Sequence, residues 1–130
     1  MFEKGDLVLK DVGWVKRLFR SVDAMDVETF LDFLEDDARF RFGSEQAVEG
    51  KDVIRETLEG FFASIKGLRH EILETWFHAE TVICQGQVTY TRTDDSSVTI
   101  PFVNVLHMRK DRIREYLIYV DISPLYSAAS

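Results

Sequence analysis

The stretch SVTIPFVNVLHMR, residues 97–109, decides the fold of this chain. Apolar side chains and one asparagine occupy every second position, which is the period of a β-strand with one buried face. The even-numbered residues make up that face: Val98, Ile100, Phe102, Asn104, Leu106 and Met108. We therefore predict a long strand whose even positions point into the protein.

The segments on both sides continue the two-residue period. We predict further strands at about residues 69–78, 81–93 and 112–122, with turns at 94–96 and 110–111. Even positions again face inward in the second and third of these, while the pattern does not fix the facing of 69–78. Successive strands joined by short turns form an antiparallel meander.

The first half of the chain has helical spacing instead. We predict helices over residues 10–24, from an N-cap at Asp26, and from about Lys51 to Lys66, with Gly67 as the last C-cap. Between the second and third helices, residues 38–43 alternate apolar and charged side chains. They predict one more strand, with Phe40 and Phe42 facing in and Asp36-Asp37 ending the helix before it.

Helices followed by strands indicate an α+β fold. We expect one domain over residues 1–130, with a core at about 10–125, in which three N-terminal helices pack in a strongly curved antiparallel sheet. The net charge of −7 disfavours nucleic acid and membrane surfaces as partners. A single cysteine, Cys84, is expected to be an inert core residue, and the charged N-terminus predicts a cytoplasmic protein.

The odd-numbered face of the sheet also carries apolar and aromatic side chains. They are Val103, Val105, His107, Leu117 and Tyr119. Clustered apolar groups on an outer face are typical of an interaction surface, so we predict a homodimer through that face. The alternative is a set of scattered surface hydrophobic residues.

Three stretches resemble a known family: residues 22–38, 49–54 and 101–121. Their order and spacing are similar to those of SnoaL-like and ketosteroid isomerase-like domains of the nuclear transport factor 2-like superfamily, over about residues 10–125. This resemblance implies a cone-shaped, cystatin-like fold. It implies an apolar small-molecule pocket between sheet and helices, and isomerase, cyclase or hydrolase chemistry without a cofactor.

The isomerase machinery itself does not carry over. Ketosteroid isomerases use an aspartate base, a tyrosine and a protonated aspartate. The matching positions here are Phe42, Leu18 and Asn104. A phenyl ring cannot accept a proton and a leucine cannot donate one, so the resemblance does not imply steroid isomerisation by that mechanism.

Seven residues are candidates to line the ligand pocket: Asn104, Tyr90, Tyr116, Trp76, Phe42, Phe102 and Ile118. For Asn104, the alternative is an amide whose hydrogen bonds are made by Tyr90, Tyr116 or water. If Trp76 faces the pocket, His78 and Glu74 could serve as a base and its orienting group; otherwise they lie at the solvent edge. We expect Asp121 and His107 to face outward and His70 to be exposed.

Three functions stay open at this level. The first is a cofactor-free enzyme acting on an apolar carbonyl compound, which requires a titratable group in the pocket. The second is a non-catalytic, dimeric ligand-binding or accessory domain. The third is a protein-binding scaffold, as in nuclear transport, although no residue marks a specific partner. No metal-ligand spacing and no phosphate loop is present, so we expect neither a metal nor a cofactor.

Overall fold

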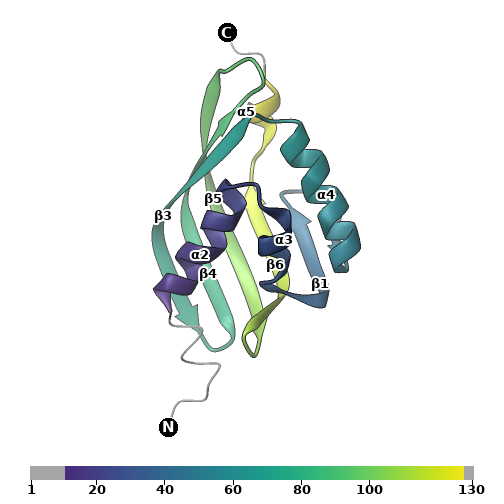
Figure 1. The fold of residues 1–130 in the computed structure, drawn as a ribbon. Coiled ribbons are helices and arrows are strands. Elements are labelled where there is room, and N and C mark those ends of the chain that lie inside the picture. The colour runs from purple at the N-terminus through teal and green to yellow at the C-terminus, as the bar shows by residue number, and fades with distance from the viewer. Residues whose placement is uncertain (1–10, 128–130) are drawn as a thin grey trace.

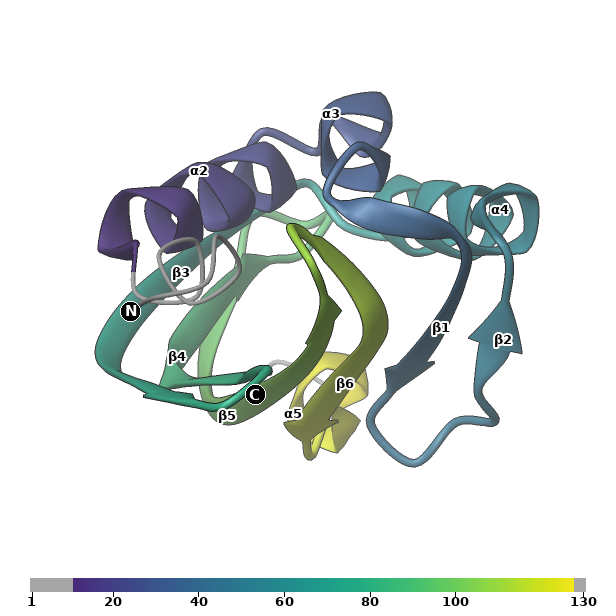
Figure 2. The same ribbon diagram turned by 90° about the horizontal axis from the view of Figure 1, so that it is seen from below.

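The computed structural model describes residues 11–127 and confirms the α+β fold. The strands are β1 (Leu34–Phe42), β2 (Val48–Glu49), β3 (Gly67–His78), β4 (Thr81–Thr91), β5 (Ser97–Arg109) and β6 (Arg112–Val120). The helices are α2 (Val12–Asp23), α3 (Val27–Leu31), α4 (Lys51–Ala63) and α5 (Ser123–Tyr126). The six strands form one sheet in the order β2-β1-β6-β5-β4-β3, which curls beneath α2, α3 and α4 (Figures 1 and 2).

Several local predictions need correction. β1 runs parallel to β6, so the sheet is antiparallel except for this pair. Asp36-Asp37 lie within β1 and do not end the preceding helix. Helix α4 ends earlier than expected, with Ser64 as its C-cap, and Gly67 begins β3. The short elements β2 and α5 add to the predicted set.

The predicted facing of β4, β5 and β6 is confirmed. Even positions from 82 to 90 in β4 and from 100 to 108 in β5 are buried. In β6 a bulge opposite His107 and Met108 adds one residue, so Ile113 is buried as well as Tyr116. Such a bulge inverts the alternation locally.

The helices close the concave side of the sheet. Helix α2 buries Trp14, Val15, Leu18 and Phe19 on one face, as the helical spacing predicts. Helix α3 begins as expected after Asp26, whose carboxylate accepts a hydrogen bond from the backbone N–H of Thr29 at 3.2 Å. These two helices place the end of α2 directly over the sheet interior.

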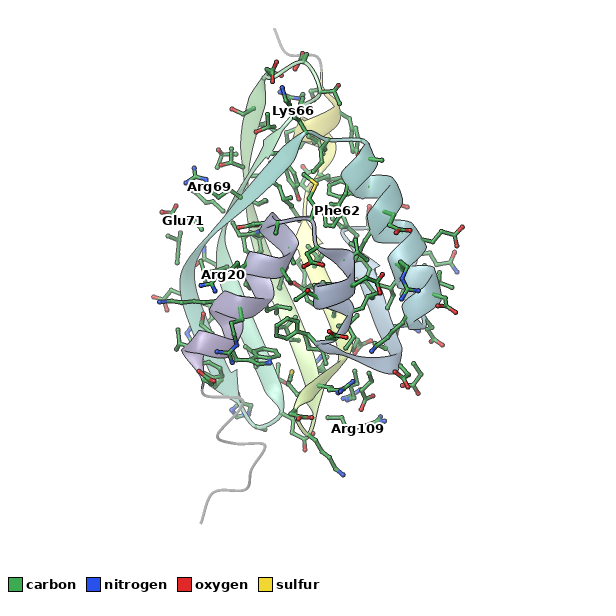
Figure 3. All side chains as sticks on the ribbon, in the orientation of Figure 1. Arg20, Phe62, Lys66, Arg69, Glu71 and Arg109 are labelled. Atoms are coloured by element: carbon green, nitrogen blue, oxygen red, sulfur yellow. The ribbon has the colours of Figure 1, made fainter. Side chains whose placement is uncertain are left out.

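A β-bulge in β3 decides which side chains of this strand face inward. Ile72 pairs with Gly86 of β4 while Glu74 pairs with Gln85, so Leu73 is the extra residue. Before the bulge His70 points inward, whereas Arg69 and Glu71 on either side of it project away from the molecule (Figure 3). After the bulge the parity is reversed.

Glycine at position 86 makes this bulge possible. A Cβ atom there would overlap the backbone carbonyl oxygen of Glu71 and lie 3.1 Å from the Cα of Ile72. Backbone groups cannot move aside as a flexible side chain can. Only a residue without a side chain allows β3 to approach β4 so closely.

We predict that Gly86→Ala destabilises the protein by about 2–3 kcal/mol, because the added methyl group forces the two strands apart. Urea unfolding followed by circular dichroism measures this change. Gly60→Ala is the matched control: position 60 lies in α4 with open space around it. That substitution is expected to stabilise the helix by about 0.5–1 kcal/mol. Equal unfolding midpoints for Gly86→Ala and the wild type would contradict the assigned role of Gly86.

Candidate functional site

An apolar cavity of about 40 Å³ lies between the sheet and the helices. Eight aromatic rings line it: Phe30, Phe40, Phe42, Phe61, Phe62, Tyr90, Phe102 and Tyr116. Two further polar side chains, those of His70 and Asn104, complete the polar part of the lining. A surface groove of about 390 Å³ beside α5 shares Phe42 and Val120 with the cavity.

Six of the seven predicted pocket residues line this cavity. They are Asn104, Tyr90, Tyr116, Phe42, Phe102 and Ile118. The placement of Trp76 was wrong: its side chain is 46% exposed. Because the bulge at Leu73 reverses the parity, Glu74 and His78 are exposed on the outer face as well. They therefore cannot act as a base and its orienting group in this cavity.

The prediction for His70 was also wrong, since its side chain is only 10% exposed. Its Nδ1 lies 2.6 Å from Oδ1 of Asp23, the last residue of α2. The backbone N–H of His70 also donates to Oδ2 of Asp23, at 3.0 Å. One carboxylate thus binds both the ring and the backbone of the histidine, and connects α2 with β3.

This contact fixes the chemistry of the imidazole. A carboxylate oxygen accepts hydrogen bonds, so Nδ1 carries the proton and Nε2 of the neutral ring is left as the basic nitrogen. The ring is held between Phe19 and Phe102, with centroid distances of 5.0 and 5.1 Å. Within residues 11–127, Nε2 makes no hydrogen bond, so it is free to exchange a proton with a ligand.

Asn104 and Tyr116 form a second polar pair in the lining. Nδ2 of Asn104 donates a hydrogen bond to the hydroxyl oxygen of Tyr116 at 3.1 Å. Oδ1 of Asn104 is buried and has no partner among the described residues. Burial above all, with a smaller contribution from Asp23, raises the pKa of Tyr116 well above its ordinary value of about 10. The phenol is therefore neutral at physiological pH.

Other titratable groups offer no comparable chemistry. Burial raises the pKa of Tyr90, and it raises the pKa of the Cys84 thiol to about 11, so this cysteine is an inert core residue as predicted. Asp121 is exposed and accepts hydrogen bonds from the backbone and hydroxyl of Ser123, which lower its pKa. His107 lies on the outer face, 3.2 Å from Thr81. Both outward predictions are confirmed.

At the two positions that resemble those of the isomerase base and phenol, this structure has apolar side chains. Phe42 lines the cavity and Leu18 is completely buried in α2. The titratable pair comes instead from the end of α2 and from β3. Sequence reasoning missed it because the facing of β3 was open. The signal was present, since Leu68 and Ile72 flank His70 at the two-residue spacing of a buried face.

No group of three His, Cys, Asp or Glu side chains within residues 11–127 could hold a metal ion. Among the same residues, no helix is long and apolar enough to cross a membrane. A comparison with curated proteins found no match.

Solved structures share the fold at low sequence identity. A protein assigned as a SnoaL-like polyketide cyclase from Jannaschia sp. CCS1 is 17% identical, with a TM-score of 0.82 and coverage of 98% of this chain and 95% of that one. A protein of unknown function from Burkholderia pseudomallei K96243, described as nuclear transport factor 2-like, is 16% identical, with a TM-score of 0.80 and 95% coverage of both chains. An epoxide hydrolase from M. tuberculosis is 14% identical, with a TM-score of 0.73, covering 95% of this chain and 86% of that one.

These likenesses show the nuclear transport factor 2-like fold alone, because proteins of one fold can catalyse unrelated reactions. The sequence model of the SnoaL-like domain family matches residues 15–116, which is most of the chain. The protein therefore belongs to the SnoaL-like domain family.

Proposed function

We propose that this protein is a cofactor-free enzyme that transfers protons to and from a small apolar molecule bound in the cavity. The observation that carries this proposal is the His70–Asp23 pair at the wall of an aromatic cavity, with Nδ1 and Oδ1 2.6 Å apart. A general base must be held in one tautomer and must reach the substrate. The geometry of His70 meets the first condition, and its place in the lining meets the second.

In the proposed reaction, Nε2 of His70 takes a proton from a carbon atom next to an electron-withdrawing group of the substrate, and the electron pair of the broken C–H bond moves onto that group. The ring then becomes an imidazolium, and Asp23 stabilises its positive charge. In the second half of the reaction, Nε2 returns the proton to another atom of the same molecule. Asp23 acts as a positioning residue, as the carboxylate does in other His–Asp pairs.

The aromatic walls support this role in two ways. They bind the flat, apolar part of a substrate through the faces and edges of their rings. They also keep water away from the reacting atoms, which strengthens the electrostatic interactions inside the site. A molecule larger than the cavity would extend past Phe42 and Val120 into the groove beside α5.

Two solved structures give this proposal its context. Two solved structures with the same fold bear the names of enzymes, a polyketide cyclase and an epoxide hydrolase. These names apply to those proteins and not to this chain. For this chain we propose only proton transfer as the reaction type.

A non-catalytic binding domain is the second candidate. Its support is the apolar character of Phe42 and Leu18, the positions where the isomerases carry catalytic groups. A cavity of about 40 Å³ encloses only part of a ring compound, whose remainder would extend past Phe42 and Val120 into the groove beside α5. The two candidates differ in one respect, which is whether His70 accelerates proton removal from a bound molecule.

We predict that the protein accelerates the Kemp elimination of 5-nitrobenzisoxazole, in which a base removes the ring C–H proton while the N–O bond breaks to give a phenolate nitrile. His70→Gln is expected to lower the rate by about 100-fold, because a well-placed base contributes 10²–10⁴-fold. The matched control is His78→Gln, an exposed histidine of the same strand, which is expected to leave the rate unchanged. A wild-type rate no higher than that of free imidazole at equal concentration would refute the proposal.

Asp23→Asn tests the positioning role separately. The substitution replaces a carboxylate that only accepts by an amide whose NH2 can donate to Nδ1, so we expect a mixture of ring tautomers in the ¹⁵N spectrum of His70 and a rate at least tenfold lower. Asp23→Glu is expected to restore part of the rate, since it retains the carboxylate. A purely structural role for Asp23 would leave the tautomer of a folded variant unchanged.

We also propose that the outer sheet face forms a homodimer, centred on the paired residues Val105 and Leu117. Val105→Glu is expected to give monomers in analytical ultracentrifugation, because a buried unpaired carboxylate is costly in an interface. Val53→Glu, on an exposed position of α4, is the matched control and should leave the dimer intact. A monomeric wild-type protein at about 50 µM would contradict the proposal, given that stable dimers of this kind persist at such concentrations.

A further inference from the structure

Asn104 and Tyr116 present unused hydrogen-bonding capacity to an otherwise apolar cavity. The exposed fraction of Asn104 is 1% and that of Tyr116 is 2%, and both line the cavity. Their mutual hydrogen bond, 3.1 Å long, uses one donor of the amide and one lone pair of the hydroxyl. Oδ1 of Asn104 has no partner among the described residues. The hydroxyl proton of Tyr116 likewise makes no hydrogen bond within residues 11–127.

The spare capacity of this pair is of mixed type. In the arrangement above, the spare acceptor is Oδ1 of Asn104, and the spare donors are the hydroxyl of Tyr116 and the second N–H of the amide. If the amide were turned by 180°, the tyrosine would donate to Oδ1. Both amide N–H groups would then be spare donors, and the Tyr116 oxygen would be a spare acceptor. Either way, the pair offers at least one donor and one acceptor to whatever occupies the cavity.

We propose that this pair binds a hydroxyl group of the ligand, so that the site takes apolar molecules bearing an alcohol or enol. The proposal rests on the proposed function in that it names the substrate class for the same cavity. A hydroxyl group donates one hydrogen bond and accepts another, so it satisfies both members of the pair at once. A ketone only accepts, and would leave the buried acceptor unpaired, which is costly. A hydrocarbon would leave both unpaired.

Charged ligand groups fit this position poorly. The surrounding lining is aromatic and aliphatic, with Phe40 and Phe30 packed against Tyr116 at centroid distances of 5.6 and 5.4 Å. A carboxylate or ammonium group would lose its hydration there without an opposite charge directly beside it. A neutral hydroxyl group loses much less, and regains its hydrogen bonds from the pair.

The hydroxyl site and the proposed base can act on one molecule. His70 packs edge-to-face on Phe102, and Phe102 and Asn104 are two residues apart on the same face of β5. Two residues along a strand span about 6.6 Å. The bound hydroxyl and the carbon that loses its proton would therefore be separated by a few bonds.

The test compares three small probes of similar shape: cyclohexanol, cyclohexanone and methylcyclohexane. Binding is measured by ¹H–¹⁵N NMR titration of the full-length protein, following the side-chain amide signals of Asn104. We expect cyclohexanol to bind about tenfold more tightly than either other probe, the effect of one or two buried hydrogen bonds. Equal affinity for the alcohol and the ketone would overturn the proposal, as would the absence of any saturable shift of the Asn104 signals.

Two variants make the test specific to the pair. Asn104→Leu keeps the shape of the side chain but leaves the buried Tyr116 hydroxyl without its partner, so its melting temperature should fall by a few degrees while the fold is retained. Its affinity for cyclohexanol, followed through backbone signals of β5, should fall to that for methylcyclohexane. Tyr116→Phe should reduce the preference for the alcohol in the same way. If Asn104→Leu folds and still prefers the alcohol, the assignment is wrong.

The result of this binding test can be distinguished from the result of the Kemp assay for the proposed enzyme activity. Binding is measured without turnover, and His78→Gln, an exposed position outside the cavity, should retain the preference for cyclohexanol. Loss of that preference in Asn104→Leu, together with an inactive wild type in the Kemp assay, would support the hydroxyl site and reject the catalytic base. The reverse pair of results would support the base and reject the hydroxyl site.

Discussion

The close approach of β3 to Gly86 is the constraint on which the site depends. Because position 86 has no side chain, the carbonyl of Glu71 can lie against it and Leu73 can bulge out of the ladder. The bulge divides β3 into two halves of opposite parity. In the first half His70 faces the cavity, and in the second half Trp76 faces solvent. A regular strand would have placed both on the same face, since their numbers differ by six.

The contact between α2 and β3 then turns an inward histidine into a defined chemical group. Asp23 ends α2 and binds both the ring and the backbone of His70. Phe19, one turn earlier in α2, packs on the same ring. The helix therefore supplies the carboxylate and part of the wall together. Any shift of α2 along the sheet would change the tautomer and the orientation of the imidazole at once.

The sequence predicted the fold and the residues that β4 and β5 contribute to the cavity. It did not predict which residues of β3 face the cavity. In β4 and β5 the alternation is unbroken, so parity alone placed Tyr90, Phe102 and Asn104 correctly. In β3 the apolar residues Leu68 and Ile72 share one parity while Thr75 and Phe77 share the other, and no single assignment fits both. A bulge explains the conflict, but the pattern does not say where the extra residue lies. The partner of His70 is 47 residues away on a helix, and a periodic pattern carries no information about such a contact.

The contact between His70 and Asp23 alters what the comparison with ketosteroid isomerases implies. At the positions of their base and their phenol, this chain has Phe42 and Leu18, which taken alone indicate a site without acid–base chemistry. The described structure instead places a histidine and a carboxylate at the junction of α2 and β3. Asn104 keeps the position of the third isomerase group, but an amide beside a neutral tyrosine both donates and accepts, whereas a protonated carboxyl group mainly donates. A site with its titratable pair on one wall and a mixed polar pair on the other is suited to a substrate that enters with its own hydroxyl group.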